Sequence, residues 1–124
     1  MKWYIRAFRK YAVFSGRDSR KAFWMFVLIH VLVTLAVGFV DAALMGLRGT
    51  LPEIVPDGIL LKLYALVAFL PSLAITVRRL HDAGYSGWHL LLDLIPLVGP
   101  IILVMILALR GEEGSNRYGP PPAQ

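Results

Sequence analysis

Apolar residues gather in three long runs along the chain, separated by short polar segments. The runs cover residues 22–40, 59–77 and 88–109. Each is close to the roughly 20 residues that an α-helix needs to cross a hydrocarbon core about 30 Å thick. Because lipid offers no hydrogen-bond partners to a backbone, such runs are helical inside a membrane. The pattern therefore predicts an all-α integral membrane protein with three transmembrane helices.

The third run contains the helix breakers Pro96, Gly99 and Pro100. Proline lacks the backbone N–H group that the helix ladder needs, so the run is either a kinked helix or two half-helices. We favour the continuous but kinked helix, which would place the tail, residues 110–124, on the far side of the membrane. The alternative is a re-entrant hairpin, which would return the tail to the side of the N-terminus.

Residues 1–14 precede the first run and show helical periodicity. Their basic and apolar side chains fall on opposite arcs: Lys2, Arg6, Arg9 and Lys10 against Tyr4, Ile5, Phe8 and Ala12. This pattern predicts an amphipathic helix in the headgroup plane, with a frayed basic terminus as the alternative. Ser15 and Gly16 end it, and Asp18 or Ser19 can cap the first spanning helix.

The tail is too rich in glycine and proline to form a regular element. Its segment Asn116, Arg117, Tyr118 and Gly119 either docks onto the helices, binds a partner or is disordered. Together with the spans it completes a single membrane domain over residues 1–124.

Composition agrees with a membrane protein of one domain. Hydrophobic residues make up 57% of the 124 residues and the mean hydropathy is +0.64, which exceeds what a small soluble domain can bury. The chain has no cysteine, which excludes disulfides, thiolate catalysis and cysteine-based metal sites.

The positive charge is concentrated at the N-terminus. The net charge is +5, and seven of the thirteen Lys and Arg residues precede residue 22: Lys2, Arg6, Arg9, Lys10, Arg17, Arg20 and Lys21. Next to an apolar run, this predicts contact with anionic lipid headgroups rather than with nucleic acid. It also predicts a cytoplasmic N-terminus in a multi-pass membrane protein.

The loop and the hinge that follow agree with this topology. The loop over residues 41–58 has one arginine, Arg48, and three acidic residues, Asp41, Glu53 and Asp57, so we expect it outside the cytoplasm. The segment after the second run carries two arginines, so we expect it on the cytoplasmic side.

That segment, residues 78–88, reads RRLHDAGYSGW and joins the second apolar run to the third. We interpret it as a hinge and interaction surface formed by Arg78, Arg79, His81, Asp82, Gly84, Ser86, Gly87 and Trp88. Asp82 can pair with either arginine on one helix face, Gly84 can supply a left-handed cap and Ser86 can cap the next helix.

A catalytic or metal-binding role for this segment is less well supported. His81 and Asp82 are adjacent and point apart on a helix, and only His30 and His89 remain as further imidazole ligands. No catalytic residue, metal or other cofactor is therefore predicted.

Polar residues inside the apolar runs point to a second candidate site. By the helix rise, His30, Ser72 and Asp93 lie roughly 8–12 Å from the inner ends of their spans. They could form an intramembrane site for protons or a small solute, or a hydrogen-bond cluster that fixes packing, which we favour. Lys62 and Asp41 lie near the outer ends, where they can snorkel or pair with each other.

A stripe of small residues, Gly38, Ala42 and Gly46, would permit close helix contact. Because three helices make a thin bundle, a homo-oligomer or a membrane-protein partner is expected.

The motifs GRDSRKAFW (residues 16–24), RRLHDAGYSGW (78–88) and NRYGPPP (116–122) together resemble a small bacterial inner-membrane family typified by YhaH and YhaI. The similarity extends over nearly the whole chain. Two positions depart from the family pattern: Ala22 stands where an acidic residue is common, and His89 replaces a second tryptophan. The resemblance implies an integral inner-membrane protein and no particular reaction.

These observations favour a non-enzymatic small subunit, adaptor or scaffold that interacts through its basic cytoplasmic face. The alternative is a small oligomeric transporter or channel-like protein that uses His30, Ser72 and Asp93. An enzyme centred on His81 and Asp82 ranks third.

Overall fold

The computed structural model describes residues 1–50 and 57–123, apart from the side chain of Arg48. Its elements in chain order are α1 (Lys2–Arg9), α2 (Arg20–Gly46), the 3-10 helix η1 (Arg48–Thr50), α3 (Ile59–Asp82), the 3-10 helix η2 (Gly87–Leu94) and α4 (Val98–Ala108). The regular elements in these ranges are helical, as the sequence predicted. Glu53, which contributes to the charge of the first loop, lies outside the described residues.

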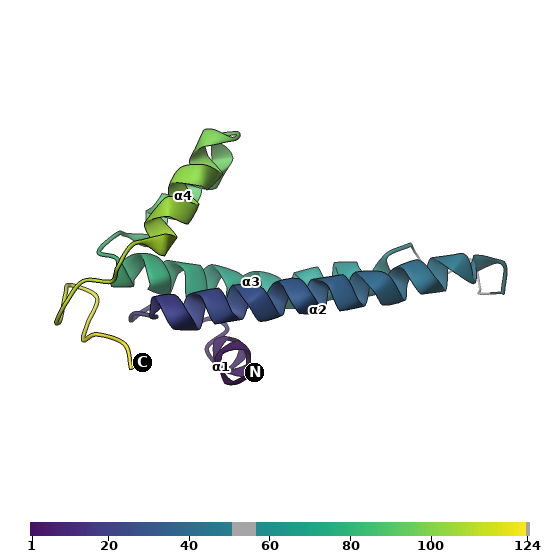
Figure 1. Ribbon diagram of the computed structural model, residues 1–124, viewed down its shortest axis with the longest axis horizontal. Coiled ribbons are helices and arrows are strands. Elements are labelled where there is room, and N and C mark those ends of the chain that lie inside the picture. Colours follow the sequence, from purple (N-terminus) through teal and green to yellow (C-terminus); the bar gives the residue numbers. More distant parts are fainter. Residues whose placement is uncertain (51–56, 124) are drawn as a thin grey trace.

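Helices α2 and α3 run side by side along the length of the molecule (Figure 1). They contain 27 and 24 residues, which corresponds to about 40 and 36 Å at the α-helical rise. Both are long and apolar enough to cross a membrane, whereas α4 is shorter. They include the first two predicted spans and extend a few residues beyond them.

Side chains cap both long helices at their starts. Ser19 accepts a hydrogen bond from the amide of Ala22, 3.2 Å away, as a helix N-cap does. The buried carboxylate of Asp41 accepts the amides of Leu60 and Leu61 at 3.2 and 2.6 Å. It thereby caps α3 from the neighbouring helix.

The pairing of Asp41 with Lys62, one of the alternatives that the sequence left open, is therefore not formed. Lys62 instead donates to the carbonyl of Asp57 at 2.9 Å. The free amides at the start of α3 attract the Asp41 carboxylate directly.

The third apolar run is not one continuous helix, which corrects the expectation of a kinked span. Pro96 cannot donate to a helix ladder, and Leu97 takes a φ of +65°, which reverses the chain between η2 and α4. Helix α4 then packs back against η2, and it has only 11 residues. The run is thus a helical hairpin, here called the η2–α4 hairpin.

The hydrophobic core lies at one end of the α2–α3 pair, which we call the hinge end. There α1, α2, α3 and α4 contribute to one cluster of buried side chains: Ala7, Phe23, Phe26, Ile75, Leu80, Leu103, Ile106 and Leu107. In Figure 1, α1 lies on one side of the pair, while the η2–α4 hairpin diverges from it on the other. Helix α1 ends at Arg9, so it is shorter than the predicted 1–14 helix.

Away from the hinge end, α2 and α3 leave large apolar side chains exposed, among them Leu35, Phe39, Leu66 and Val67. Exposed apolar surface of this extent requires an apolar surrounding or a partner.

Candidate functional site

Five charged side chains meet at the hinge end, and we call them the arginine–aspartate cluster: Arg17, Asp18, Arg78, Arg79 and Asp82. The first two lie just before α2, and the others lie in the last turns of α3. Every one of these side chains is at most 5% exposed. Such burial is unusual for charged groups and requires that each be paired.

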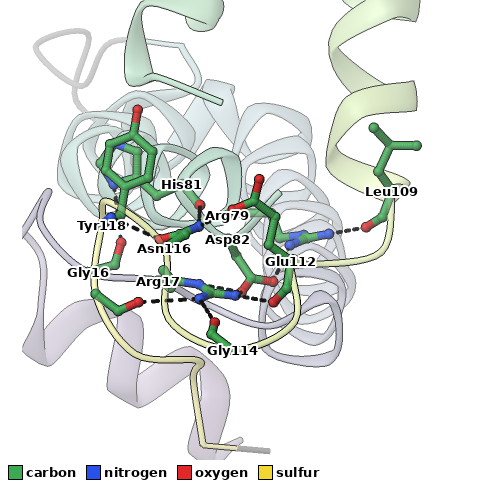
Figure 2. Close-up of polar contacts among 11 residues, drawn as sticks. Gly16, Arg17, Arg79, His81, Asp82, Leu109, Glu112, Gly114, Asn116 and Tyr118 are labelled. Atoms are coloured by element: carbon green, nitrogen blue, oxygen red, sulfur yellow. Dashed lines mark hydrogen bonds and ion pairs between the residues drawn. The ribbon is translucent and has the colours of Figure 1, made fainter. Parts of the chain in front are cut away.

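Asp82 is shared between two of the arginines (Figure 2). The Nε atom of Arg17 donates to one of its carboxylate oxygens at 2.9 Å, and Nη1 of Arg79 donates to the other at 2.5 Å. Arg78 pairs separately with Asp18, with 2.5 Å between Nε and Oδ2. The sequence predicted an Asp82 pair with Arg78 or Arg79, and the structure places Arg79 there.

Backbone carbonyls accept further hydrogen bonds from these guanidinium groups. Arg79 donates to the carbonyls of Leu107, at 3.0 Å, and Leu109, where α4 leaves its last carbonyls without helical partners. Arg78 donates to the carbonyls of Lys10 and Val13. Each arginine therefore fastens a different segment of the chain to the end of α3.

Arg17 holds the tail. Its guanidinium donates to the carbonyls of Glu112 and Gly114, each at 2.6 Å, and to that of Gly119 at 3.3 Å. Among the described residues, no buried side-chain nitrogen or oxygen is left without a hydrogen bond. The surplus positive charge of the cluster is thus solvated by the tail backbone, which gives the tail a fixed path.

His81 and the tail form a second contact next to the cluster (Figure 2). The His81 ring stacks on Tyr118, with 3.8 Å between the ring centroids and 5° between the planes. Its Nδ1 lies 3.1 Å from the carbonyl of Gly16, so this nitrogen carries the proton and donates. Asn116 donates to the His81 carbonyl at 2.9 Å. The tail therefore docks onto the helices, one of the alternatives that the sequence left open.

The hinge turn is built from its glycines. Gly84 takes a φ of +84°, and the amide of Tyr85 bonds to the carbonyl of Leu80 at 2.9 Å, as in a Schellman C-cap. A side chain on Gly87 would press against Val77, because an added Cβ would come within 3.1 Å of it.

Ser86 precedes η2 without capping it through its side chain. Its hydroxyl lies 3.4 Å from His89 Nδ1 instead. Trp88 is exposed. Of the eight predicted hinge residues, Arg78, Arg79 and Asp82 are buried and Trp88 is exposed, while the remaining four are partly buried: His81, Gly84, Ser86 and Gly87.

His30, Ser72 and Asp93 do not come together. Ser72 donates to the carbonyl of Ala68 in its own helix at 2.7 Å, and Asp93 is exposed on η2. His30 lies 2.6 Å from the hydroxyl of Tyr64. A site that combines these three side chains requires three full transmembrane spans. The hairpin removes Asp93 from such an arrangement.

Tyr64 also lies 2.8 Å from the hydroxyl of Tyr4, so a hydrogen-bonded chain links α1, α3 and α2. Burial and the bond to Tyr64 raise the pKa of the Tyr4 phenol above its ordinary value. This series of hydrogen bonds was not predicted from the sequence, because tyrosine was grouped with the apolar residues.

The basic residues near the N-terminus divide into two groups. Lys2, Arg9, Arg20 and Lys21 are exposed, and Lys10 is partly buried. Arg17 is buried, which corrects its assignment as lipid-facing, and Arg6 lies 3.6 Å from Asp18. Burial of Arg17 follows from its ion pair with Asp82. The matching charges of the segments Arg17-Asp18 and Arg78-Arg79-Asp82 were the signal in the sequence for these pairs.

A polar cavity of about 630 Å³ opens between the start of α2 and the tail. The Arg17–Asp82 pair lines it together with Ser19, Arg20, Lys21, Arg110, Gly111, Glu112, Glu113, Gly114, Pro121 and Pro122. Among residues 1–50 and 57–123, no group of three or more His, Asp or Glu side chains is placed to hold a metal ion.

The described residues form a small helical protein in which two helices long and apolar enough to cross a membrane meet a polar hinge end that holds the tail. The family described as "Protein of unknown function (DUF805)" matches residues 11–120, and the chain belongs to this family. It is 38% identical to the inner membrane protein YhaH of Escherichia coli (strain K12) over 122 residues, which cover 98% of this chain and 97% of YhaH. It is 41% identical to the inner membrane protein YhaI of the same strain, over 98% of this chain and 96% of YhaI. No solved structure matches the chain.

Proposed function

We propose that the protein is a multi-pass inner-membrane protein in which α2 and α3 cross the bilayer and the hinge end faces the cytoplasm. The lengths of the two helices and the names of YhaH and YhaI support the membrane setting. The exposed cations Lys2, Arg9, Arg20 and Lys21 all lie in the N-terminal segment at the hinge end, and the positive-inside rule puts such an end in the cytoplasm.

The proposed role is that of a non-enzymatic adaptor or scaffold. One observation carries this proposal: the groups of the hinge that could perform chemistry are engaged in holding the chain together. Asp82 binds two arginines, and His81 is stacked on Tyr118 and bonded to Gly16. The hinge end is thereby a fixed platform formed from the N-terminal segment, the end of α3 and the tail.

The exposed cations around this platform are the proposed interaction groups. Among the described residues, the side chains of Arg20 and Lys21 form no ion pair, and both line the cavity next to the tail. Exposed, unpaired cations beside a cavity suit an acidic segment of a second membrane protein. Arg78 and Arg79, which the sequence offered as the docking surface, are buried and cannot serve in this way.

The test is the composition of the complex extracted gently from its native membrane. Arg20→Glu should lower the yield of a co-extracted protein several-fold, because it places like charges against an acidic partner. Lys62→Glu is the matched control, since Lys62 is an exposed cation of α3 near the opposite end of the α2–α3 pair. Equal yields from the two variants, or a homo-oligomer without a second protein, would contradict the adaptor role.

A further inference from the structure

The η2–α4 hairpin reverses direction at a tight turn. The amide of Gly99 bonds to the carbonyl of Ile95 at 3.1 Å, and that of Val98 bonds to the carbonyl of Pro96 at 2.8 Å. Gly99 is pressed so closely against η2 that an added Cβ would lie 1.7 Å from the carbonyl oxygen of Leu92. The close approach of the two backbones gives the hairpin one defined shape.

Both ends of the hairpin are fixed at the hinge end. Gly87 packs on Val77 of α3 where η2 begins. Where α4 ends, Arg79 holds the carbonyls of Leu107 and Leu109, and the amide of Glu112 bonds to the carbonyl of Asp82 at 2.8 Å. The chain therefore leaves the hinge end and returns to it.

The surface of the hairpin exposes many large apolar side chains, which is unfavourable in water. Leu94 and Leu97 near the turn are 77% and 81% exposed. Large exposed side chains continue along both of its arms: Trp88, Leu91, Ile95, Val98, Ile101, Val104 and Met105. No residue of α4 has a charged or polar side chain. Such a surface needs an apolar occupant on several sides at once.

Helix α4 is too short to cross a bilayer. Its 11 residues span about 16 Å, roughly half of a hydrocarbon core about 30 Å thick. A protein partner would bury one face of such a helix and meet some polar side chains there, whereas acyl chains can cover every face of α4 that the protein core leaves exposed. Its length, its fixed ends and the apolar character of every side that its own chain leaves exposed together favour the acyl chains of one leaflet.

The two arms differ in polarity, which indicates how the hairpin is tilted. η2 contains Trp88, His89 and the exposed Asp93, and an ionised carboxylate is costly among acyl chains. Tryptophan favours the headgroup level, where one side of the ring is wet. In a bilayer, η2 would therefore lie closer to the headgroups and α4 deeper among the acyl chains.

We propose that the η2–α4 hairpin is embedded in a single leaflet, the one that contains the start of α2, with α4 among the acyl chains and η2 at headgroup level. This inference rests on the proposed membrane setting but is independent of the adaptor role. It adds a lipid-binding surface on one side of the α2–α3 pair, opposite to α1 (Figure 1).

The absence of native cysteine allows a direct test. Single cysteines at Leu97, Leu91, Ile101 and Ser115 carry an environment-sensitive fluorophore in vesicles of phosphatidylethanolamine and phosphatidylglycerol. Spin-labelled lipids should quench the label at Leu97, while aqueous iodide should quench it several-fold less than at Ser115 in the exposed tail. Lipid labelled deep in the acyl chain should quench Ile101 of α4 more than Leu91 of η2.

Three outcomes would overturn the proposal. Iodide quenching at Leu97 as strong as at Ser115 would place the hairpin in water. Disulfide cross-linking between Leu97→Cys chains, with loss of lipid quenching, would make the occupant a second copy. Equal depths for Leu91 and Ile101 would contradict the tilt.

The sidedness of the membrane provides a separate readout. An impermeant thiol reagent applied to intact spheroplasts should leave Ser115→Cys unlabelled, and labelling there would show a full span in place of the hairpin. Gly99→Ala should raise iodide access at Leu97, because the added methyl group forces η2 and α4 apart, while Gly38→Ala, with open space around it, should not. These readouts concern depth and sidedness, so they can fail while the complex yield in the Arg20→Glu experiment stays as expected.

Discussion

The guanidinium of Arg17 and the carboxylate of Asp82 lie 2.9 Å apart, although 65 residues separate them in the sequence. Arg17 also donates to three carbonyls of the tail, and Asp82 also binds Arg79. One ion pair thus joins the start of α2, the end of α3 and the tail. The same contacts explain why the arginine–aspartate cluster can be buried although it is charged.

Replacement of Arg17 by glutamine should release the tail. The change removes a buried ion pair and leaves tail carbonyls without donors, which should cost about 3 kcal/mol. Trypsin cleavage after the exposed Arg117 reports the release, because the docked tail resists the protease. Arg20→Gln is the control, since Arg20 is an exposed arginine of the same region. Equal cleavage rates for the two variants would show that Arg17 does not hold the tail.

The ring of Tyr118 should stabilise the docked tail by stacking on His81, without a contribution from its hydroxyl group. Tyr118→Ala removes the ring that lies against His81, which should cost roughly 0.5–1.5 kcal/mol and speed cleavage after Arg117 about two- to tenfold. Tyr118→Phe keeps the ring and should leave the rate near that of the wild type. A Phe variant as labile as the Ala variant would instead assign the contact to the hydroxyl.

Asp18 and Arg78 should be strongly coupled in a double-mutant cycle. Their side chains are 4% and 2% exposed, so Asp18→Asn and Arg78→Gln should each destabilise the fold, with a coupling free energy of about 1–3 kcal/mol. Thermal unfolding in detergent measures both. The exposed pair Arg110 and Glu113 is the control and should show no measurable coupling, because water screens it. Additive effects at Asp18 and Arg78 would contradict this prediction.

Tyr64→Phe should loosen α1 from the α2–α3 pair. The change removes the hydroxyl that contacts both His30 and Tyr4 and should cost about 0.6–2 kcal/mol. Tyr11→Phe changes an exposed phenol and serves as the comparison. Identical unfolding temperatures would mean that the hydrogen-bonded chain adds nothing to stability.

Local features of the fold could be predicted because they depend on neighbours in the sequence. The apolar runs over 22–40 and 59–77 mark α2 and α3 by length alone. Ser19 caps α2, Gly84 takes the left-handed conformation, and Asp82 pairs with Arg79 three residues earlier. Each of these depends on spacing within one turn of helix.

The third run could not be resolved from its pattern. When nearly every position is apolar, periodicity does not distinguish a spanning helix from a hairpin, and Pro96 and Pro100 are compatible with both. The contact between Gly99 and the carbonyl of Leu92 determines the outcome, and this contact exists only once the two arms are packed. The expectation of a full third span also led to the incorrect placement of Asp93 near His30.

By itself, the sequence determined the helical class, the two long membrane-capable helices, the Ser19 cap of α2, the Gly84 turn after α3 and the family, because these follow from composition, local spacing and motifs. Only the tertiary structure decided that Arg17, Arg78 and Arg79 are buried, that the tail docks at the hinge end, and that the third run turns back. The physical reason is that a buried charge is stable only with partners. The charged partners of Arg17 and Arg78 lie 60 or more residues away, and Arg79 depends on backbone carbonyls at the end of α4 as well as on the nearby Asp82. Residue type alone does not encode such pairings.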